Sequence, residues 1–255
     1  MTELLPWEKE LEPIDIVMTC FNRLQLTKDA IRHIVERTTH PYRLIVVDNN
    51  SADGTQDYLF EAKKKGLIHH LILLEENYGI HMAKNYGLAL VRSEPYYIDT
   101  DNDLLCAKLE PDWISQLVDL MDRYPKYGAI SCRPQVLVGR GDDFKDAEEV
   151  VKFNHTGAHL RIMRTKVVRD VGGWEKTWTA NRNHEDSFIA SRLQSAGYDV
   201  GYARDVRCWH IFGADNNWGY RNIPPEKHGH RPMWPPPNHW DEIIDKFNLE
   251  TWKEK

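Results

Sequence analysis

The feature that most constrains the fold is a regular alternation of short apolar runs and helix-like segments over the first hundred residues. Four runs rich in aliphatic and β-branched side chains, at 14–19, 43–47, 67–74 and 96–98, are typical of strands. Between them, residues 24–37, 56–65 and 81–91 have the spacing of helices. Strands that alternate with helices predict a parallel sheet with right-handed crossovers. We therefore expect an α/β fold with a mostly parallel central sheet flanked by helices.

The second half of the chain is less regular. Helices are expected at 112–124 and 186–196, and strands at 129–132 and 158–163. The composition changes after Cys208, because the last fifty residues hold five of the nine Trp and six of the thirteen Pro, a content that excludes one long helix. The pattern predicts an N-terminal extension at 1–13, an α/β domain at 14–213 and a Pro- and Trp-rich tail or lid at 214–255.

Charge and cysteine content exclude several classes of protein. The 33 Lys and Arg against 39 Asp and Glu give a formal net charge of −6, which argues against a nucleic-acid partner. The four cysteines are widely spaced, so they indicate neither a zinc knuckle nor a disulfide framework. The first residues lack the features of a signal peptide, and the longest uncharged apolar stretch is too short for a transmembrane segment. We expect a cytoplasmic protein, soluble or at most peripheral to a membrane.

Acidic residues follow two of the expected strands. In parallel α/β sheets, ligands bind outside the carboxyl ends of the strands, which draws attention to Asp48 and Asp99. Taken alone, Asp48 is also a common turn former or helix cap. Asp99, Asp101 and Asp103 alternate, and three such carboxylates repel one another unless a cation or hydrogen-bond donors neutralise them. The pattern favours a Mg²⁺ or Mn²⁺ site, with a solvated acidic turn as the alternative.

Six motifs carry a resemblance to a known family. In chain order they are IVMTCFNR, VVDNNSADGT, ENYGIHMAKNYGLAL, YYIDTDND, GGWE and NHEDSFIASRLQSAGYDV. Together they resemble the nucleotide-sugar-dependent glycosyltransferases of the GT-A fold, a Rossmann-like fold, and most of all the large inverting family 2 that includes bacterial polysaccharide transferases. The resemblance spans roughly residues 14 to 213. It implies a nucleotide-binding half at 14–103 and an acceptor-binding half at 104–213.

On the donor side, the resemblance implies contacts to the nucleotide and its sugar. The first loop would lie beside the nucleotide, Asp48 would contact the nucleobase, and the stretch around the Lys84-Asn85 pair would line the nucleotide and sugar. The first Asp of the family's D-x-D motif usually approaches the ribose or the sugar. The implied donor-binding residues are Thr19, Phe21, Asn22, Arg23, Asp48, Asn77, Gly79, Lys84, Asp99 and Thr100.

The metal site implied by the resemblance has two possible registers. The second Asp of the D-x-D motif usually binds Mn²⁺ or Mg²⁺, and this corresponds to Asp101. The sequence also offers Asp101-Asn102-Asp103, so which Asp holds the ion is open. Related enzymes often place a metal-binding His near the position of His210, although a lone His is more commonly only hydrogen-bonded. The expected ligands are therefore Asp101, Asp103 and His210.

Inversion requires a base on the opposite face of the sugar, because the acceptor hydroxyl must lose its proton as it attacks. The resemblance favours Asp186 as that base, with Glu185 in reserve or in an acceptor-binding role. Asp186 alone would also fit the N-terminus of a helix. Further acceptor-binding residues are Trp174, Glu175 and His184, with core packing as the alternative for Trp174.

The strand-end motifs and the resemblance that they carry imply a metal-dependent glycosyltransferase. It would move a sugar from a nucleoside-diphosphate sugar, with UDP-sugars favoured, to a hydroxyl of a carbohydrate or glycan acceptor with inversion. Two alternatives remain open: a retaining GT-A enzyme, and a catalytically silent nucleotide- or carbohydrate-binding protein of the same fold.

Overall fold

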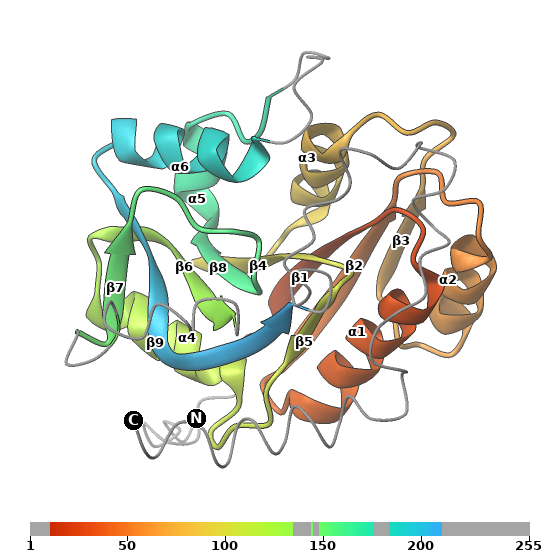
Figure 1. Cartoon of the computed structure of the whole chain (residues 1–255), viewed down its shortest axis with the longest axis horizontal. Helices are drawn as coiled ribbons and strands as arrows, with labels where there is room; N and C mark the ends of the chain where they lie inside the picture. Colours follow the sequence, from red (N-terminus) through yellow and green to blue (C-terminus); the bar gives the residue numbers. More distant parts are fainter. Residues whose placement is uncertain (1–10, 135–143, 145–147, 176–183, 211–255) are drawn as a thin grey trace, which may run out of the picture.

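A mixed β-sheet lies at the centre of the molecule, with helices on both faces (Figure 1). The computed structural model describes residues 11–134, 144, 148–175 and 184–210. Within these ranges the sheet has nine strands in the order β3-β2-β1-β4-β8-β6-β9-β5, and β7 pairs with β9. The predicted N-terminal extension and C-terminal tail lie almost entirely outside the described residues.

The first half of the chain forms the parallel part of the sheet. Its elements are β1 (Ile14–Cys20), α1 (Leu24–Arg37), β2 (Tyr42–Asp48), α2 (Thr55–Lys64), β3 (His70–Leu73), α3 (Ile80–Leu90) and β4 (Tyr96–Asp101). Strand β1 pairs in parallel with β2 and β4, and β2 pairs in parallel with β3. All seven residues of β1 are buried, as expected of a central strand covered on both faces.

The second half of the chain adds strands of both directions. Its elements are β5 (Leu104–Cys106), α4 (Trp113–Arg123), β6 (Tyr127–Pro134), β7 (Val150–Phe153), β8 (Arg161–Arg164), α5 (Thr165–Asp170), α6 (Glu185–Ser195) and β9 (Asp199–His210). Strand β8 runs antiparallel between β4 and β6, while β9 is parallel to β6 and antiparallel to β5 and β7. The predicted α/β fold is confirmed, but only the first half of the sheet is purely parallel.

Two apolar layers hold the helices against the sheet. Alternate residues of a strand point to opposite faces, so Ile16 and Met18 pack with α1, α2 and α4, while Val17 packs with α3, α5 and α6. In Figure 1 these two groups of helices lie on opposite sides of the sheet. Gly87 allows α3 to approach β1 closely, because a Cβ at this position would lie 2.2 Å from Cγ1 of Val17.

Helix α4 shows how the sequence encodes a local element. Asp112 caps its N-terminus, since the side chain accepts hydrogen bonds from the backbone N–H of Ile114 at 2.8 Å and of Ser115 at 3.0 Å. Its other carboxylate oxygen accepts bonds from the backbone N–H groups of Thr39 and His40. The cap therefore also fastens α4 to the segment that follows α1.

Several element boundaries differ from those expected. The third strand begins only at His70 rather than at residue 67, and β4 continues to Asp101 rather than ending at residue 98. The short elements β5, β7 and α5 were not expected. Asp99 and Asp101 therefore lie inside a strand, which fixes the direction of their side chains.

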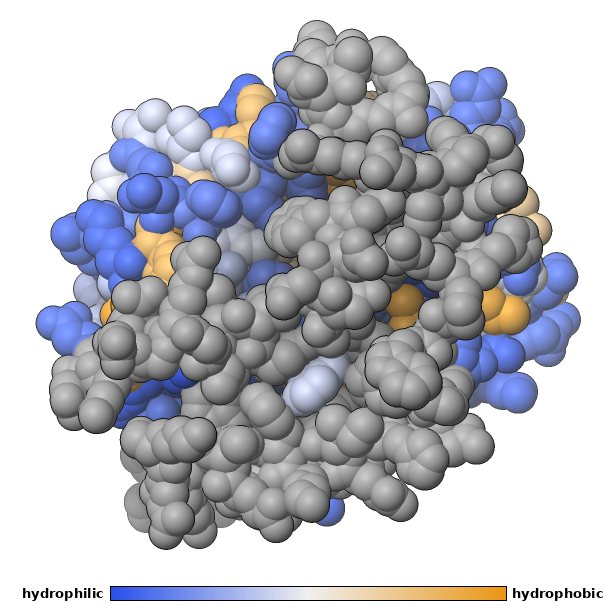
Figure 2. Space-filling view, viewed as in Figure 1, coloured by the Kyte–Doolittle hydropathy of each residue, from blue (hydrophilic) through white to orange (hydrophobic). Residues whose placement is uncertain are grey.

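The described surface is mainly polar. On the face shown in Figure 2, hydrophilic side chains dominate the coloured surface, and hydrophobic ones form small separate patches. Large hydrophobic side chains exposed within the described ranges include Phe21, Phe60 and Tyr86. No helix in the part of the chain that the structure describes has the length and apolar character needed to cross a bilayer.

Candidate active site

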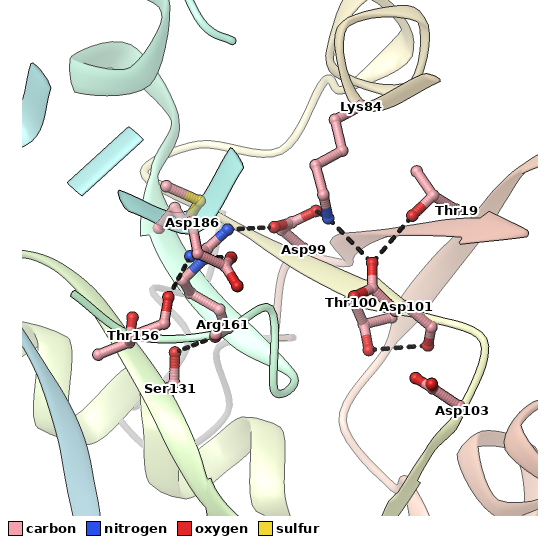
Figure 3. A network of polar contacts seen from close by, with 12 residues as sticks. Thr19, Lys84, Asp99, Thr100, Asp101, Asp103, Ser131, Thr156, Arg161 and Asp186 are labelled. Carbon is pink, nitrogen blue, oxygen red and sulfur yellow. Dashed lines mark hydrogen bonds and ion pairs between the residues drawn. The ribbon is translucent and has the colours of Figure 1, made fainter. Parts of the chain in front are cut away.

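The site lies where β1, β2 and β4 end side by side. The parallel register places Thr19 beside Asp101 and Cys20 beside Asp48. The hydroxyl of Thr19 donates a 3.0 Å hydrogen bond to Oδ1 of Asp101 (Figure 3). The strand-end residues singled out in the sequence are thus brought to one edge of the sheet.

Asp48 is fully buried and holds the turn that follows β2. Its carboxylate accepts hydrogen bonds from the backbone N–H of Ser51 at 2.9 Å, from the Ser51 hydroxyl and from Nε2 of Gln56 at 2.8 Å. These are the contacts of a turn former, the alternative considered for this residue. The predicted contact with a nucleobase stays a prediction.

The loop after β1 has an unusual backbone that is tied to the loop after β2. Asn22 and Arg23 both have positive φ, at 55° and 65°, which is uncommon for non-glycine residues. The backbone N–H of Asn22 donates to the Ser51 hydroxyl at 2.6 Å, and the Asn22 side chain accepts a bond from the N–H of Ala52 at 2.8 Å. Phe21 remains 38% exposed beside them. The loop is therefore preformed, with one aromatic side chain available to a ligand.

The start of α3 is fixed by a pair of asparagines. Nδ2 of Asn49 donates to Oδ1 of Asn77 at 2.9 Å, and the same oxygen accepts a bond from the N–H of Gly79 at 3.0 Å. Gly79 has a φ of 83°, which glycine adopts without the strain that a Cβ would bring. Asn77 and Gly79 therefore position α3 in the structure. Their contact with the nucleotide sugar remains a prediction.

Lys84 of α3 projects between two of the three aspartates. Its Nζ lies 2.8 Å from Oδ1 of Asp99 and 3.1 Å from Oδ1 of Asp101, as Figure 3 shows. The Lys84 and Asp99 side chains are fully buried, whereas the Asp101 side chain is 33% exposed. Burial opposes the charge on Lys84, but the two carboxylates outweigh it and raise its pKa. The expected repulsion among the aspartates is thus relieved in part by a lysine.

Arg161 of β8 completes the neutralisation of Asp99. Its Nη2 donates to Oδ2 of Asp99 at 2.7 Å, and its Nη1 donates to Oδ1 of Asp186 at 3.0 Å and to the carbonyl of Thr156 at 2.8 Å (Figure 3). Burial would raise the pKa of Asp99, but Lys84 and Arg161 together hold it below its usual value. The sequence interpretation missed Arg161. The available signal was an Arg inside an otherwise apolar run.

Asp103 belongs to a second charged cluster. Its carboxylate lies 2.6 Å from Nη1 of Arg23 and 3.5 Å from Nε2 of His210. Burial would raise the pKa of Asp103, but His210 and Arg23 lower it well below its usual value. The ring of His159 lies 5.0 Å from that of His210, and burial together with His210 lowers its pKa strongly. The structure thus brings Asp103 and His210, two of the predicted metal ligands, close together and adds His159.

The predicted metal ligands suit Mn²⁺ or Mg²⁺ by their chemistry. Among the described residues, Oδ2 of Asp101 has no hydrogen-bond partner, and its side chain is partly exposed, so one carboxylate oxygen is available to a cation. Carboxylate oxygens suit Mg²⁺, and an additional imidazole suits Mn²⁺. No three acidic, His or Cys side chains converge on one point within the described ranges. Ligation by Asp101, Asp103 and His210 therefore stays a prediction.

Glu185 and Asp186 lie in the first turn of α6, where the helix dipole favours negative charge. Burial is nevertheless the dominant influence and, with Asp186 and Asp101 nearby, raises the pKa of Glu185 to about 7. Burial also raises the pKa of Asp186, although Arg161 and Lys84 oppose the shift. Shifted carboxylates of this kind are frequent at catalytic sites.

Asn85 of α3 binds the backbone of Trp174 and Glu175, two of the predicted acceptor-binding residues. Its Nδ2 donates to the carbonyl of Trp174 at 3.1 Å, and its Oδ1 accepts a bond from the N–H of Trp174 at 3.0 Å. The Trp174 ring is only 1% exposed and packs in the core, which favours the packing alternative over stacking on a sugar. Glu175 follows it, and His184 immediately precedes α6. Sugar contacts by these three residues remain predictions.

Comparison with known proteins identifies the family. The model of the family described as Glycosyl transferase family 2 matches residues 15–185. Poly-beta-1,6-N-acetyl-D-glucosamine synthase of Staphylococcus aureus (strain COL) is 22% identical over 215 residues, which are 78% of this chain and 50% of that protein. The Staphylococcus epidermidis synthase is 20% identical over 216 residues, which are 79% of this chain and 50% of that protein. The chain therefore spans about half the length of these relatives.

Solved structures share the fold at low sequence identity. Mannosyltransferase PcManGT from Pyrobaculum calidifontis, in complex with GDP-Man and Mn²⁺, superposes with a TM-score of 0.62 at 20% identity, over 78% of this chain and 56% of that one. S. aureus TarS 1–349 in complex with UDP gives a TM-score of 0.61 at 15% identity, over 78% and 60%. The solved structures show that the chain has the GT-A fold. Because the family model covers more than half of the sequence, the chain belongs to the family described as Glycosyl transferase family 2.

Proposed function

We propose that this protein transfers a sugar from a UDP-sugar to a hydroxyl of a carbohydrate acceptor, with inversion at the anomeric carbon and with Mn²⁺ or Mg²⁺. The names of related proteins support the class of reaction, since they include a polymer synthase of N-acetyl-D-glucosamine and a structure in complex with UDP. A GDP-mannose complex among the similar structures makes the nucleobase the first point to test.

The reaction requires stabilisation of the charge that develops on the leaving diphosphate and removal of the proton of the acceptor hydroxyl. The oxygen of the acceptor hydroxyl forms a bond to the anomeric carbon as the bond from that carbon to the diphosphate breaks, and the bonding pair leaves with the diphosphate. Positive groups near the diphosphate stabilise the charge that develops there, and Lys84 and Arg23 are two of the basic side chains described at this edge of the sheet. A divalent ion, held by Asp101 with Asp103 or His210, would supply further stabilisation of the same charge.

The hydroxyl proton passes to a carboxylate, for which we assign Asp186. Arg161 holds Oδ1 of this residue, and Oδ2 has no hydrogen-bond partner among the described residues. Glu185, with its pKa near 7, is partly protonated at neutral pH and suited to hydrogen bonding with the acceptor. This division gives the two neighbouring carboxylates different roles.

The single observation that carries the proposal is the continuous network from Lys84 through Asp99 and Arg161 to Asp186. These ion pairs join Asp99 and Asp186, which are far apart in the sequence, and so support a role for both in one site (Figure 3). A carbohydrate-binding protein without catalytic activity would not need a carboxylate held next to the donor residues.

The first experiment is a thermal-shift panel with UDP-, GDP- and dTDP-sugars, each with and without Mn²⁺. A ligand that binds only the native state raises the melting temperature, so we expect the largest shift with a UDP-sugar and Mn²⁺. A larger shift with GDP-sugars would contradict the UDP assignment. Absence of any shift together with absence of transfer would favour the catalytically silent alternative.

The second experiment separates donor binding from chemistry. Asp186→Asn should bind UDP with Mn²⁺ nearly as well as the wild type in calorimetry, while kcat falls by a factor on the order of 10² or more. The exposed Asp119→Asn on α4 is a matched control that should keep full kcat. NMR of the product reads its anomeric configuration, and retention would overturn the inverting mechanism.

A further inference from the structure

We propose that Arg161 is a positioning residue for the reaction: it orients the carboxylate of Asp186 toward the acceptor and couples it to the donor-side Asp99. This role rests on the proposed function, because it takes Asp186 as the base that removes the hydroxyl proton. None of the sequence motifs that define the site includes Arg161.

The sheet places Arg161 directly beside Asp99. The two residues are cross-strand partners in the antiparallel pair β4–β8, and their side chains meet at 2.7 Å. Strand β8 lies between β4 and β6, so the strand that carries Arg161 has a paired neighbour on each side. The guanidinium therefore starts from a rigid position in the middle of the sheet.

Three acceptors then fix the plane of the guanidinium. Nη2 binds Asp99, while Nη1 donates to both Asp186 and the backbone carbonyl of Thr156. The Arg161 side chain is 1% exposed, so water does not compete freely for these bonds. Because a guanidinium is planar and always charged, fixing Nη2 on Asp99 and one N–H of Nη1 on the Thr156 carbonyl determines where Nη1 presents its other N–H, which is to Asp186.

The contact leaves Asp186 able to react. Arg161 occupies only Oδ1, and the Asp186 side chain is 27% exposed, in contrast to the fully buried Asp99. The second carboxylate oxygen has no hydrogen-bond partner within the described part of the chain and is the one assigned to take the proton. A base held by one oxygen and open at the other meets the geometric requirement for proton transfer.

A neighbouring arginine on the same strand provides the contrast. Arg164 donates to the backbone carbonyls of Tyr127 at 2.9 Å and Met121 at 2.8 Å, and its contacts involve no carboxylate within the described ranges. Its bonds join β8 to its surroundings away from the acidic cluster. Replacing Arg164 should therefore affect stability without a specific effect on kcat, which makes it a matched control.

The test is a double-mutant cycle between Arg161 and Asp186, with Arg164→Met as the control. We expect Arg161→Met to lower kcat by a factor on the order of 30 or more, while the Kd of UDP with Mn²⁺, measured by calorimetry, changes by less than about fivefold. In the Asp186→Asn background the same substitution should lower kcat by less than about threefold, because Arg161 acts through Asp186. A merely structural residue would lower kcat equally in both backgrounds.

Arg161→Lys keeps the charge but loses the fixed fork of donors, so it should restore part of kcat relative to Arg161→Met. If Arg161→Met does not give a folded protein by circular dichroism, Arg161→Lys takes its place in the cycle. We then expect Arg161→Lys to lower kcat by about fivefold or more in the wild type and to have no further effect on kcat in the Asp186→Asn background. A kcat of the folded variant within threefold of the wild type, or equal losses in both backgrounds, overturns the proposal. Absence of transfer by the wild type refutes the proposed function itself, and this role of Arg161 with it.

Discussion

Lys84→Met tests the charge balance at the centre of the site. In the folded protein the Lys84 ammonium is fully buried and lies within 3.1 Å of one oxygen of Asp99 and one of Asp101. Methionine has a similar length and no charge, so the substitution removes the positive group without leaving a large cavity. Asp99 is then left buried with Arg161 as its remaining cationic partner among the described residues.

The expected loss of stability follows from the cost of an uncompensated buried charge. Removing one partner of a buried ion pair typically costs about 3–5 kcal/mol. We expect the lower end, about 3 kcal/mol, because Asp99 keeps Arg161 and the Asp101 side chain is 33% exposed to water. For a chain of this size that loss corresponds to a fall in Tm of roughly 6–12 °C.

Urea unfolding in the presence of EDTA measures the change without a contribution from bound metal. The control is Lys166→Met, which removes an exposed pair with Asp170 on α5 and should leave Tm unchanged. In the double variant Lys84→Met/Asp99→Asn both charges are gone, so we expect at least about 1 kcal/mol of the loss to be regained. A loss below about 0.5 kcal/mol in Lys84→Met, or losses that simply add, would refute the inferred pairing.

Three further predictions concern packing, capping and ionisation. Gly87→Ala should destabilise the fold by about 1–3 kcal/mol in urea unfolding, because its Cβ would lie 2.2 Å from Val17, and Val17→Ala should relieve part of that loss. Asp112→Ala should cost about 2–3 kcal/mol, since both carboxylate oxygens accept backbone hydrogen bonds; an unchanged Tm would contradict this. The pKa of Glu185 is about 7 in the folded protein, against an ordinary value of 4.5. The contribution of Glu185 to the free energy of unfolding is therefore fully present below about pH 4.5 and is lost as the pH rises through 7. Without metal, Glu185→Gln should therefore gain about 1–3 kcal/mol relative to the wild type between pH 5 and 8, and a pH-independent difference would exclude the shift.

The parts of the fold that the sequence predicts well are those with a local signal. The strands and helices of residues 14–101 follow from the periodicity of apolar residues, as does the helix predicted at 112–124, which is α4 in the structure. The short strands β5 and β7 have no such signal, because three or four residues are too few to show a period. Their conformation is set by pairing with β9, which is a tertiary effect.

The extension of β4 through Asp99 and Asp101 is a clear example of context overriding propensity. Aspartate is unfavourable in strands, and the apolar pattern of the sequence predicts a strand only over residues 96–98. In the structure, Lys84 and Arg161 neutralise Asp99, and pairing with Met18, Thr19 and Arg161 continues the sheet past the apolar residues. Neither basic side chain is near Asp99 in the sequence, so this compensation could not be inferred from local pattern.

The candidate site also contains residues that the sequence located and residues that it did not. Motif order located Asp101, Asp186 and Lys84, and the structure brings all three into one network. Arg161 and His159 were missed, because a single Arg or His in an apolar segment gives no indication of its partner. The contact between Arg161 and Asp99 spans 62 positions along the chain. Only the antiparallel pairing of β8 with β4, which follows a long connection, brings them together.

The carboxylate of Asp99 is held by residues from both halves of the domain. It lies in the last parallel strand of the first half, yet one of its oxygens is held by Lys84 of that half and the other by Arg161 of the second half. Removing the charge of Asp99 should weaken its contacts with both Lys84 and Arg161. We expect Asp99→Asn to weaken binding of UDP with Mn²⁺ and to lower kcat, whereas Asp186→Asn lowers kcat alone.

We expect Asp99→Asn to change both nucleotide binding and kcat because Asp99 contacts Lys84 on one side and Arg161 on the other. Lys84 would lose one of its two carboxylates on the donor side, and Arg161 would lose the charged contact that fixes its guanidinium beside the base. Calorimetry and steady-state kinetics on the same preparations measure the two effects separately. If Asp99→Asn changed only the affinity for the nucleotide and left kcat intact, the charge on Asp99 would not reach Asp186, and the link through Arg161 would have to be structural.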